Sequence, residues 1–314
     1  MKYNDLNIDL MGTKIHIRIL HENSDEILDS CKKLLLEYNE IFSIYHETSE
    51  LYNLNLYASK SPFKASDELF ELISLGKKYS LLDNSSLNIC IGPIVKLWNI
   101  GFDNAKLPTN TEIKKALSFI NPNNLLLNQD NKTVSFKFPG MIIDLGAIAK
   151  GYIADKIMEY IISKNVKSAL VDLGGNILTH GFNFSSEDIN WRIGLQDPDN
   201  PRGSHLMLLE INDLSIVTSG IYERKFEYEG NLYHHIFDSK TGYPVETNMK
   251  SISIISKKSV YCDIFTSVLF GKNFDEIEKF INKNSEIEAI AVYNSGIIKY
   301  TKGIEKYILW KDKK

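Results

Sequence analysis

The sequence predicts an α+β fold, with mixed, mainly antiparallel sheets and packed helices. Expected helices gather in the first half of the chain and expected strands in the second, without the regular alternation of a doubly wound sheet. With 314 residues and 43% hydrophobic side chains, the chain is long enough to bury a large core. No repeat and no long linker divides it, so we expect a single domain over residues 1–314.

Hydrophobic periodicity assigns the elements in order. A first strand is expected at residues 14–20, where Ile15, Ile17 and Ile19 alternate with polar residues. Ser24 and Ser66 are candidate N-caps of the two helices that follow. Further helices are expected at 111–119, 148–163, 260–269 and 274–282. Further strands are expected at 134–138, 169–173, 192–195, 207–211, 215–218, 251–255, 289–293 and 297–300.

Charge and cysteine content exclude several classes of protein. The net charge of -4 comes from interspersed acids and bases, so no basic face for nucleic acid is expected. The three cysteines, Cys31, Cys90 and Cys262, are far apart and odd in number, which disfavours a disulfide framework and a zinc site. Cys31 lies on the apolar face of an expected helix, where core packing is its expected role.

The start of the chain carries no targeting signal. Lys2, Asp5 and Asp9 interrupt a short polar run, whereas a signal peptide needs about 7 to 15 uninterrupted apolar residues. No apolar run long enough to span a membrane follows. For this sequence we therefore expect a cytoplasmic protein. If a leader segment was removed from it, we expect an extracytoplasmic, membrane-anchored protein.

The segment from Tyr233 to Pro244 concentrates reactive side chains within a turn-rich stretch. His235 and Asp238 lie three residues apart, and either could accept a proton near neutral pH. The structural alternative is a histidine hydrogen-bonded to a turn aspartate. We assign no role to the adjacent His234.

A second dense segment runs from Asp144 to Gly151. A carboxylate and a lysine flank a bend of small residues, whose main chain can approach a ligand while Lys150 pairs with a phosphate. It is not a P-loop, because Tyr152 stands where that motif requires lysine. The main-chain oxygen of Ala147 is then available to a metal ion. The alternative is a strand end with Asp144 bound to nearby amides and Lys150 in solvent.

A third segment places Asp263 and Ser267 four residues apart, on one face of an expected helix. Mg²⁺ prefers oxygen ligands, with water and phosphate completing its shell. One carboxylate, one hydroxyl and the Ala147 carbonyl form a suitable set. The alternative is that Asp263 caps its helix.

These segments resemble the ApbE family of FAD:protein FMN transferases, in the family's order and over most of the chain. The resemblance implies an ApbE-like, T-fold-related architecture. The matching segments are Met11–Thr13, Phe42–Tyr45, Ser49–Asn55, Gly92–Trp98, Asp144–Gly151 with Asp155, Val171–Gly175, Trp191–Pro198, Thr218–Gly220 with Tyr222, His235–Pro244 and the segment at Asp263.

The resemblance implies a reaction and a set of site residues. Family members cleave FAD with Mg²⁺, transfer FMN to a threonine of an acceptor flavoprotein, and release AMP. It implies that His235 or an aspartate at the metal, Asp263, takes the threonine proton. Metal ligands would be Ala147, Asp263 and Ser267. FAD would be bound by Met11, Tyr45, Leu87, Asn88, Ile89, Asp144, Lys150 and Ile236.

Departures from the family pattern leave alternatives open. Ser267 stands where threonine is usual and keeps the hydroxyl, whereas Asn88 and Ile221 each replace an acid. The same site could act in an FAD pyrophosphatase, which releases FMN and AMP. Because two acids are missing, a non-catalytic FAD-binding protein is a further alternative. Absence of an export signal favours a cytoplasmic flavoprotein as acceptor, with no direct membrane span. The number of metal ions stays open.

Overall fold

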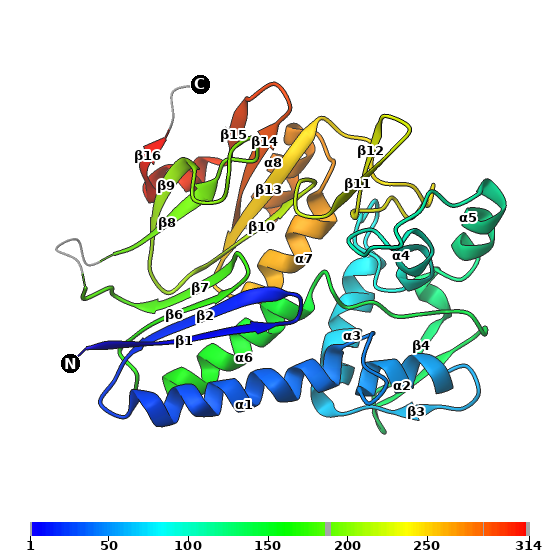
Figure 1. The fold of residues 1–314 in the computed structure, drawn as a ribbon, viewed down its shortest axis with the longest axis horizontal. Coiled ribbons are helices and arrows are strands. Elements are labelled where there is room, and N and C mark those ends of the chain that lie inside the picture. The colour runs from blue at the N-terminus through cyan, green and yellow to red at the C-terminus, as the bar shows by residue number, and fades with distance from the viewer. Residues whose placement is uncertain (1, 186–189, 285, 312–314) are drawn as a thin grey trace.

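An antiparallel sheet of eight strands organises the chain in the computed structural model, which describes residues 2–185, 190–284 and 286–311 (Figure 1). Every neighbouring pair of strands is antiparallel, which confirms the predicted fold class. In spatial order the strands are β1 (Tyr3–Leu10), β2 (Thr13–Leu20), β6 (Ser168–Leu173), β7 (Asn176–Gly181), β10 (Ser215–Gly220), β13 (Met249–Ser256), β14 (Ile287–Tyr293) and β15 (Ile298–Tyr300).

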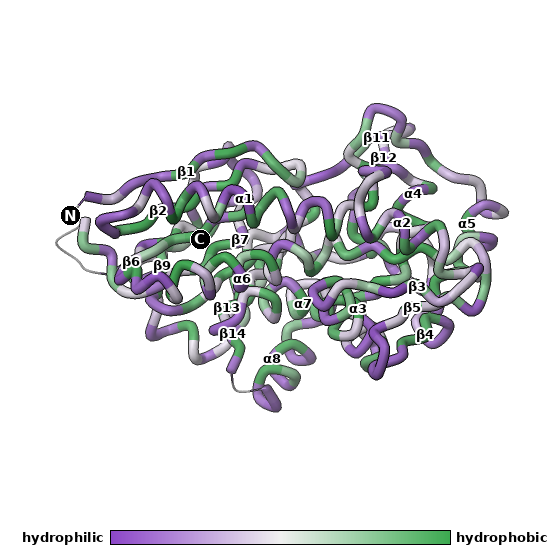
Figure 2. Tube along the Cα trace, turned by 90° about the horizontal axis from the view of Figure 1, so that it is seen from below, coloured by the Kyte–Doolittle hydropathy of each residue, from purple (hydrophilic) through white to green (hydrophobic). Residues whose placement is uncertain are grey.

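Helices cover one face of this sheet and enclose the largest core. Alternate residues of the central strands point to opposite faces, so Val217 and Ile254 join this core while Ile216 and Ile255 join another. Figure 2 shows hydrophobic chain around α6 and α7 in the middle of the molecule and hydrophilic chain at outer tips. The covering helices are α1 (Ser24–Phe42), α6 (Ala149–Ser163), α7 (Ser259–Leu269) and α8 (Phe274–Lys283).

A small sheet and a 3-10 helix cover the opposite face. Leu209 and Ile304 pack there against Ile216, Ile255 and Ile290 of the large sheet in a second core. Burial on both faces explains why the central strands are apolar along most of their length. The covering elements are β8 (Trp191–Gln196), β9 (His205–Ile211), β16 (Ile308–Lys311) and η2 (Lys302–Tyr307).

A third cluster lies beside the sheet and holds the segment that contains His235. Trp98 is fully buried at its centre, and its indole N–H donates to the carbonyl of Gly242 (2.9 Å). Phe237 packs on the same ring. The elements that contribute to this third cluster are α4 (Gly92–Trp98), α5 (Asn110–Leu117), β11 (Lys225–Tyr228) and β12 (Asn231–His234). The neighbouring elements pack instead against the largest core: α2 (Glu50–Tyr57), β3 (Phe63–Lys64), α3 (Asp67–Ser80), β4 (Leu125–Asn128) and β5 (Thr133–Phe136), with η1 (Pro122–Asn124) directly before β4.

Most predicted strands and helices are present with ends shifted by one or two residues. Ser66 is an N-cap, as expected, and accepts from the amide of Leu69. Ser24 was wrong as a cap, because it is the first helical residue and Asn23 precedes it without a side-chain bond. The run up to Leu10, read only as polar, contains strand β1, in which half-buried Leu6, Ile8 and Leu10 alternate with exposed polar residues.

The cysteines are free and buried, and Cys31 lies in the core as predicted. Among the described residues, no helix combines the length and the apolar character needed to cross a membrane.

Candidate active site

Helices α6 and α7 approach each other closely at Gly151. A methyl group added at Gly151 would lie 2.4 Å from the carbonyl oxygen of Ser259 and 2.7 Å from Cα of Val260. Because glycine has no side chain, its amide reaches the buried Asp263 and donates to Oδ2 (2.6 Å). The predicted segments at 144–151 and 263 are therefore in direct contact.

The amide of Gly151 would bond to the carbonyl of Ala147 in a regular helix, four residues earlier. Here that amide is taken by Asp263, and no described residue donates a hydrogen bond to Ala147 O. Ala147 is also exposed. Asp263 thus replaces Ala147 as the acceptor of this amide, and the Ala147 carbonyl oxygen is available to another partner.

Asp263 does not cap its helix, which begins at Ser259 after the N-cap Lys258. It lies in the second turn, and Ser267 follows one turn later on the same face. The atoms of Asp263 and Ser267 that could coordinate a metal ion are oxygens, which a hard cation such as Mg²⁺ prefers. Within residues 2–185, 190–284 and 286–311, no three His, Cys, Asp or Glu side chains converge as a metal centre, so such a site requires carbonyl or hydroxyl oxygens.

Burial raises the pKa of Asp263 to about 6, although the charge of Lys150 and the Gly151 amide lower it. A carboxylate desolvated in this way gains from a bound cation. Asn176 also acts on this carboxylate. The hydroxyl of Ser259 donates to Oδ1 of the buried Asn176, whose amide nitrogen has no hydrogen-bond partner among the described residues.

Asp155 fixes the start of α7. Its two carboxylate oxygens accept from the amides of Ser259 (2.8 Å) and Val260 (3.0 Å), the first amides of that helix. A negative charge there also complements the helix dipole. Burial raises the pKa of Asp155 to about 6, against the effect of those two bonds. Asp155 is therefore structural, and it holds the helix that carries Asp263.

His235 is neutral, and its Nε2 has no hydrogen-bond partner among the described residues. Its Nδ1 lies 3.1 Å from the carbonyl of Arg224, and because a carbonyl only accepts, Nδ1 carries the proton. Burial, together with the charges of Arg224 and Lys150, lowers the pKa of His235 to about 4, against the opposing effect of the bond to the Arg224 carbonyl. Nε2 therefore carries a lone pair at neutral pH.

The neighbours of His235 have structural roles. Nε2 of His234 donates to the carbonyl of Val245 (3.1 Å), and its Nδ1 accepts from the amide of Ile236 (3.2 Å), which occupies both nitrogens. Asp238 accepts from the amide of Lys240 within a turn and makes no bond to His235 among the described contacts. The interpretation of His235 and Asp238 as a bonded structural pair was therefore wrong.

Asp144 lies at the start of the bend, where its Oδ1 accepts from the amide of Gly146 (2.7 Å), as the structural alternative predicted. Burial raises its pKa, while Gly146, Arg224, Lys96 and Lys150 oppose that shift in this order. The charge of Lys150 acts on all three groups, Asp144, Asp263 and His235.

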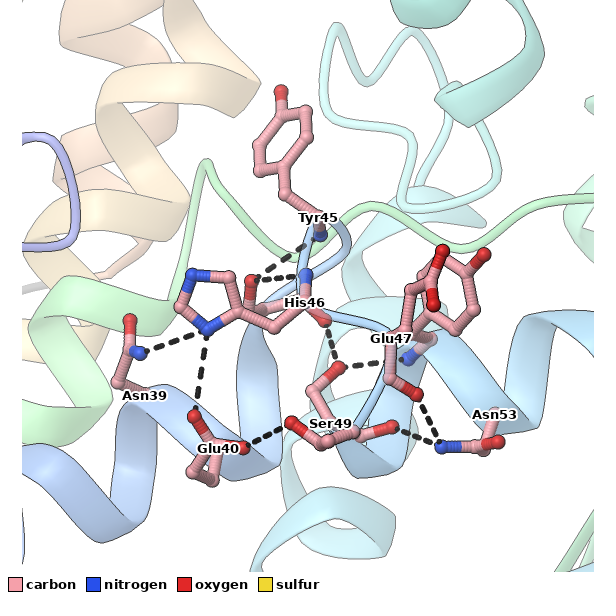
Figure 3. Close-up of polar contacts among 10 residues, drawn as sticks. Asn39, Glu40, Tyr45, His46, Glu47, Ser49 and Asn53 are labelled. Atoms are coloured by element: carbon pink, nitrogen blue, oxygen red, sulfur yellow. Dashed lines mark hydrogen bonds and ion pairs between the residues drawn. The ribbon is translucent and has the colours of Figure 1, made fainter.

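Tyr45 is presented by a hydrogen-bonded loop between α1 and α2. The hydroxyl of Ser43 accepts from the amides of Tyr45 and His46, both at 3.2 Å, and Ser49 donates to the carbonyl of Ser43. Figure 3 shows that the loop bonds turn inward, whereas the ring of Tyr45 points away from them. That ring is 54% exposed and contacts Phe102, with ring centres 5.2 Å apart. An exposed aromatic pair of this kind can stack on a flat aromatic ring of a ligand.

The remaining residues that were predicted to bind FAD differ in which of their atoms a ligand can reach. Met11 lies in the β1–β2 turn with a positive φ of 54°, and Ile236 is partly buried. The side chains of Leu87 and Ile89 are buried in the core, so only their main chain remains for a ligand. The side chain of Asn88 bonds to the carbonyl of Ile120 and the amide of Cys90.

Sequence reasoning missed Arg224, whose carbonyl holds His235. The feature that could have revealed Arg224 is the hairpin β11–β12. In this hairpin Lys225 pairs with His234, and the two strands are joined by a two-residue turn, Glu229 and Gly230. Continuing this register by one residue pairs Arg224 with His235, and the amide of His235 donates to Arg224 O (3.3 Å). A Glu-Gly turn is a weaker hairpin signal than Asn-Gly or Asp-Gly, which explains the omission.

Comparisons with known proteins agree with this fold. A profile of the ApbE family matches residues 11–291. A FAD:protein FMN transferase of Klebsiella pneumoniae is 35% identical over 283 residues, covering 90% of this chain and 87% of the relative. One from Treponema pallidum is 30% identical over 310 residues, covering 94% and 86%. The crystal structure of the ApbE protein of Thermotoga maritima superposes with a TM-score of 0.88 at 26% identity, covering 98% and 99%. The chain belongs to the ApbE family.

Proposed function

We propose that the protein is a Mg²⁺-dependent FAD:protein FMN transferase. It cleaves FAD, joins the FMN half to a threonine of an acceptor flavoprotein and releases AMP. The names of the Klebsiella and Treponema relatives support flavin transfer. The observation that carries the proposal is the bond from Gly151 to Asp263, which joins two site segments and leaves Ala147 O without a donor.

The oxygens of Ala147, Asp263 and Ser267 would hold the metal ion. Bound there, Mg²⁺ supplies positive charge that neutralises the pyrophosphate as the leaving group forms. Lys150 adds a fixed positive charge beside Asp263. Tyr45 with Met11 and Ile236, and the main chain of residues 87–89 with Asp144, would line the space for FAD.

His235 is placed to act as general base, because its Nε2 is unprotonated at neutral pH. In the proposed step, the threonine oxygen forms a bond to the flavin-side phosphorus, and its proton passes to Nε2. The bond from that phosphorus to the bridging oxygen breaks, and AMP leaves with the electron pair. A carboxylate at the metal, Asp263, is the alternative acceptor of the proton.

The test uses FAD, MgCl2 and an acceptor domain with one reactive threonine. Mass spectrometry should find FMN added to that threonine, together with AMP in equal amount. An acceptor with threonine replaced by alanine is the control. No label on a verified acceptor would refute the transferase. FMN and AMP without label would identify a pyrophosphatase in which water replaces threonine.

Asp263→Ala separates catalysis from binding. We expect it to keep flavin binding but to lose AMP release, because the charged metal ligand is removed. Ser219→Ala is a matched control, since Ser219 bonds to Thr266 of the same helix without belonging to the proposed ligand set. A wild-type protein that binds FAD and never releases AMP with Mg²⁺ present would instead be a non-catalytic FAD-binding protein.

A further inference from the structure

Arg224 is held at a point where three separate segments meet. A methyl group added at Gly101, after α4, would lie 2.9 Å from Cδ of Arg224. One added at Gly12, in the β1–β2 turn, would lie 3.4 Å from Nη2. The side chain of Arg224 therefore runs over two glycines, and a side chain at Gly101 would displace it, whereas a methyl group at Gly12 would lie in ordinary contact with it. Both glycines have positive φ, 95° and 69°, so their conformations also favour glycine.

The main chain of Arg224 holds the proposed base. Its carbonyl accepts from the amide of His235 (3.3 Å) and from Nδ1 of the same residue (3.1 Å). Substitution of the Arg224 side chain leaves this carbonyl in place. The two functions of the residue, guanidinium and carbonyl, are thus separable by mutation.

The guanidinium of Arg224 makes no hydrogen bond or ion pair with a described residue. The other three arginines of the chain are paired with carboxylates: Arg18 with Asp5 (2.7 Å), Arg192 with Glu210 (3.3 Å) and Arg202 with Glu223 (2.8 Å). The field of Arg224 acts instead on site residues, namely Asp144, Tyr45 and His235.

Positive charge exceeds negative charge around Asp144. Arg224, Lys96 and Lys150 all act on this one carboxylate, and none of the three has an ion pair among the described contacts. A half-buried site with surplus cations selects an anion. A guanidinium presents a planar fork of donors that matches two phosphate oxygens.

We infer that Arg224 binds the pyrophosphate of the dinucleotide and selects it over flavins that lack this group. The inference rests on the proposed function. The same residue contacts the proposed base through its carbonyl and would contact the phosphates through its guanidinium.

The test compares Arg224→Gln with Arg202→Gln, a control that removes the same charge from an arginine already paired with Glu223. Binding of FAD and of riboflavin is measured by quenching of flavin fluorescence, at fixed salt and without Mg²⁺. We expect Arg224→Gln to weaken FAD binding by about 10- to 100-fold, the range for a charge-assisted hydrogen bond, and riboflavin binding by less than about twofold. Arg224→Lys should recover part of the loss, since lysine keeps the charge and loses the fork.

Each other outcome contradicts the inference. Equal losses for FAD and riboflavin would show that Arg224 only shapes the pocket. Unchanged FAD binding with a raised KM for the acceptor protein would place the guanidinium on the acceptor. A wild-type protein that does not bind FAD would refute the proposed function as well, whereas normal wild-type binding with an unaffected Arg224→Gln variant would refute this inference alone.

Discussion

Gly151→Ala should disrupt the candidate site through the packing of two helices. On helix propensity alone, alanine at an interior helical position would stabilise the protein by about 1 kcal/mol. However, the new methyl group would lie 2.4 Å from the carbonyl oxygen of Ser259, whereas ordinary contact begins at 3.4 Å. Because the atoms it meets belong to the main chain, α7 has to move by about 1 Å, the difference between these distances.

This displacement affects both stability and the metal site. Overpacking costs about 1–3 kcal/mol. The bond from Gly151 to Asp263, now 2.6 Å, would lengthen to about 3.6 Å and be lost, which costs about 1.5–3 kcal/mol for a charged acceptor. After the propensity gain, the free energy of unfolding should fall by roughly 2–5 kcal/mol, and the melting temperature by roughly 3–8 °C for a chain of this length.

The assay is thermal unfolding followed by circular dichroism, with and without MgCl2. We expect a lower melting temperature and a smaller increase on adding Mg²⁺, because the Gly151 amide no longer holds the Asp263 carboxylate in place. Gly146→Ala is the control, since its methyl group would come no closer than 3.0 Å to a side-chain oxygen of Asp144. A Gly151→Ala protein as stable as wild type, with the same response to Mg²⁺, would refute the reasoning.

Three further predictions concern buried or reactive groups of the site. Asp155→Ala leaves two buried amides of α7 without an acceptor, so the free energy of unfolding should fall by about 2–4 kcal/mol in urea denaturation, and a loss below about 1 kcal/mol would contradict this role. Because burial raises the pKa of Asp263 to about 6 from 3.8, its contribution to metal-free stability is lost as pH rises through about 6. Mg²⁺ binds the charged form, so the Mg²⁺-induced rise in melting temperature should be larger at pH 7.5 than at pH 5, and an equal rise at both would exclude Asp263 as a ligand. His235→Gln should slow FMN transfer by about 10²–10⁴-fold with FAD binding kept, and an unchanged rate would assign the proton to another group.

Much of the secondary structure was predictable because its signals are local. The alternation of Ile15, Ile17 and Ile19 gave β2, and the Ser66 cap gave the start of α3. Asp263 and Ser267 were predicted to share a helix face, and both lie on α7. The hairpin β11–β12 was missed because its turn residues are a weak signal, and with it the register that brings Arg224 to His235.

The sequence by itself determined which groups are present: a carboxylate and hydroxyl one helical turn apart, a lysine after a small-residue bend, and a histidine in a turn. Only the tertiary structure decided their chemical state. Gly151 has no local pattern that shows it facing Ser259, yet that contact draws its amide from Ala147 to Asp263. Likewise, the unprotonated Nε2 of His235 follows from burial and from the Arg224 carbonyl eleven residues earlier. Both depend on distances between segments remote in sequence, because desolvation and hydrogen bonding act through space rather than along the chain.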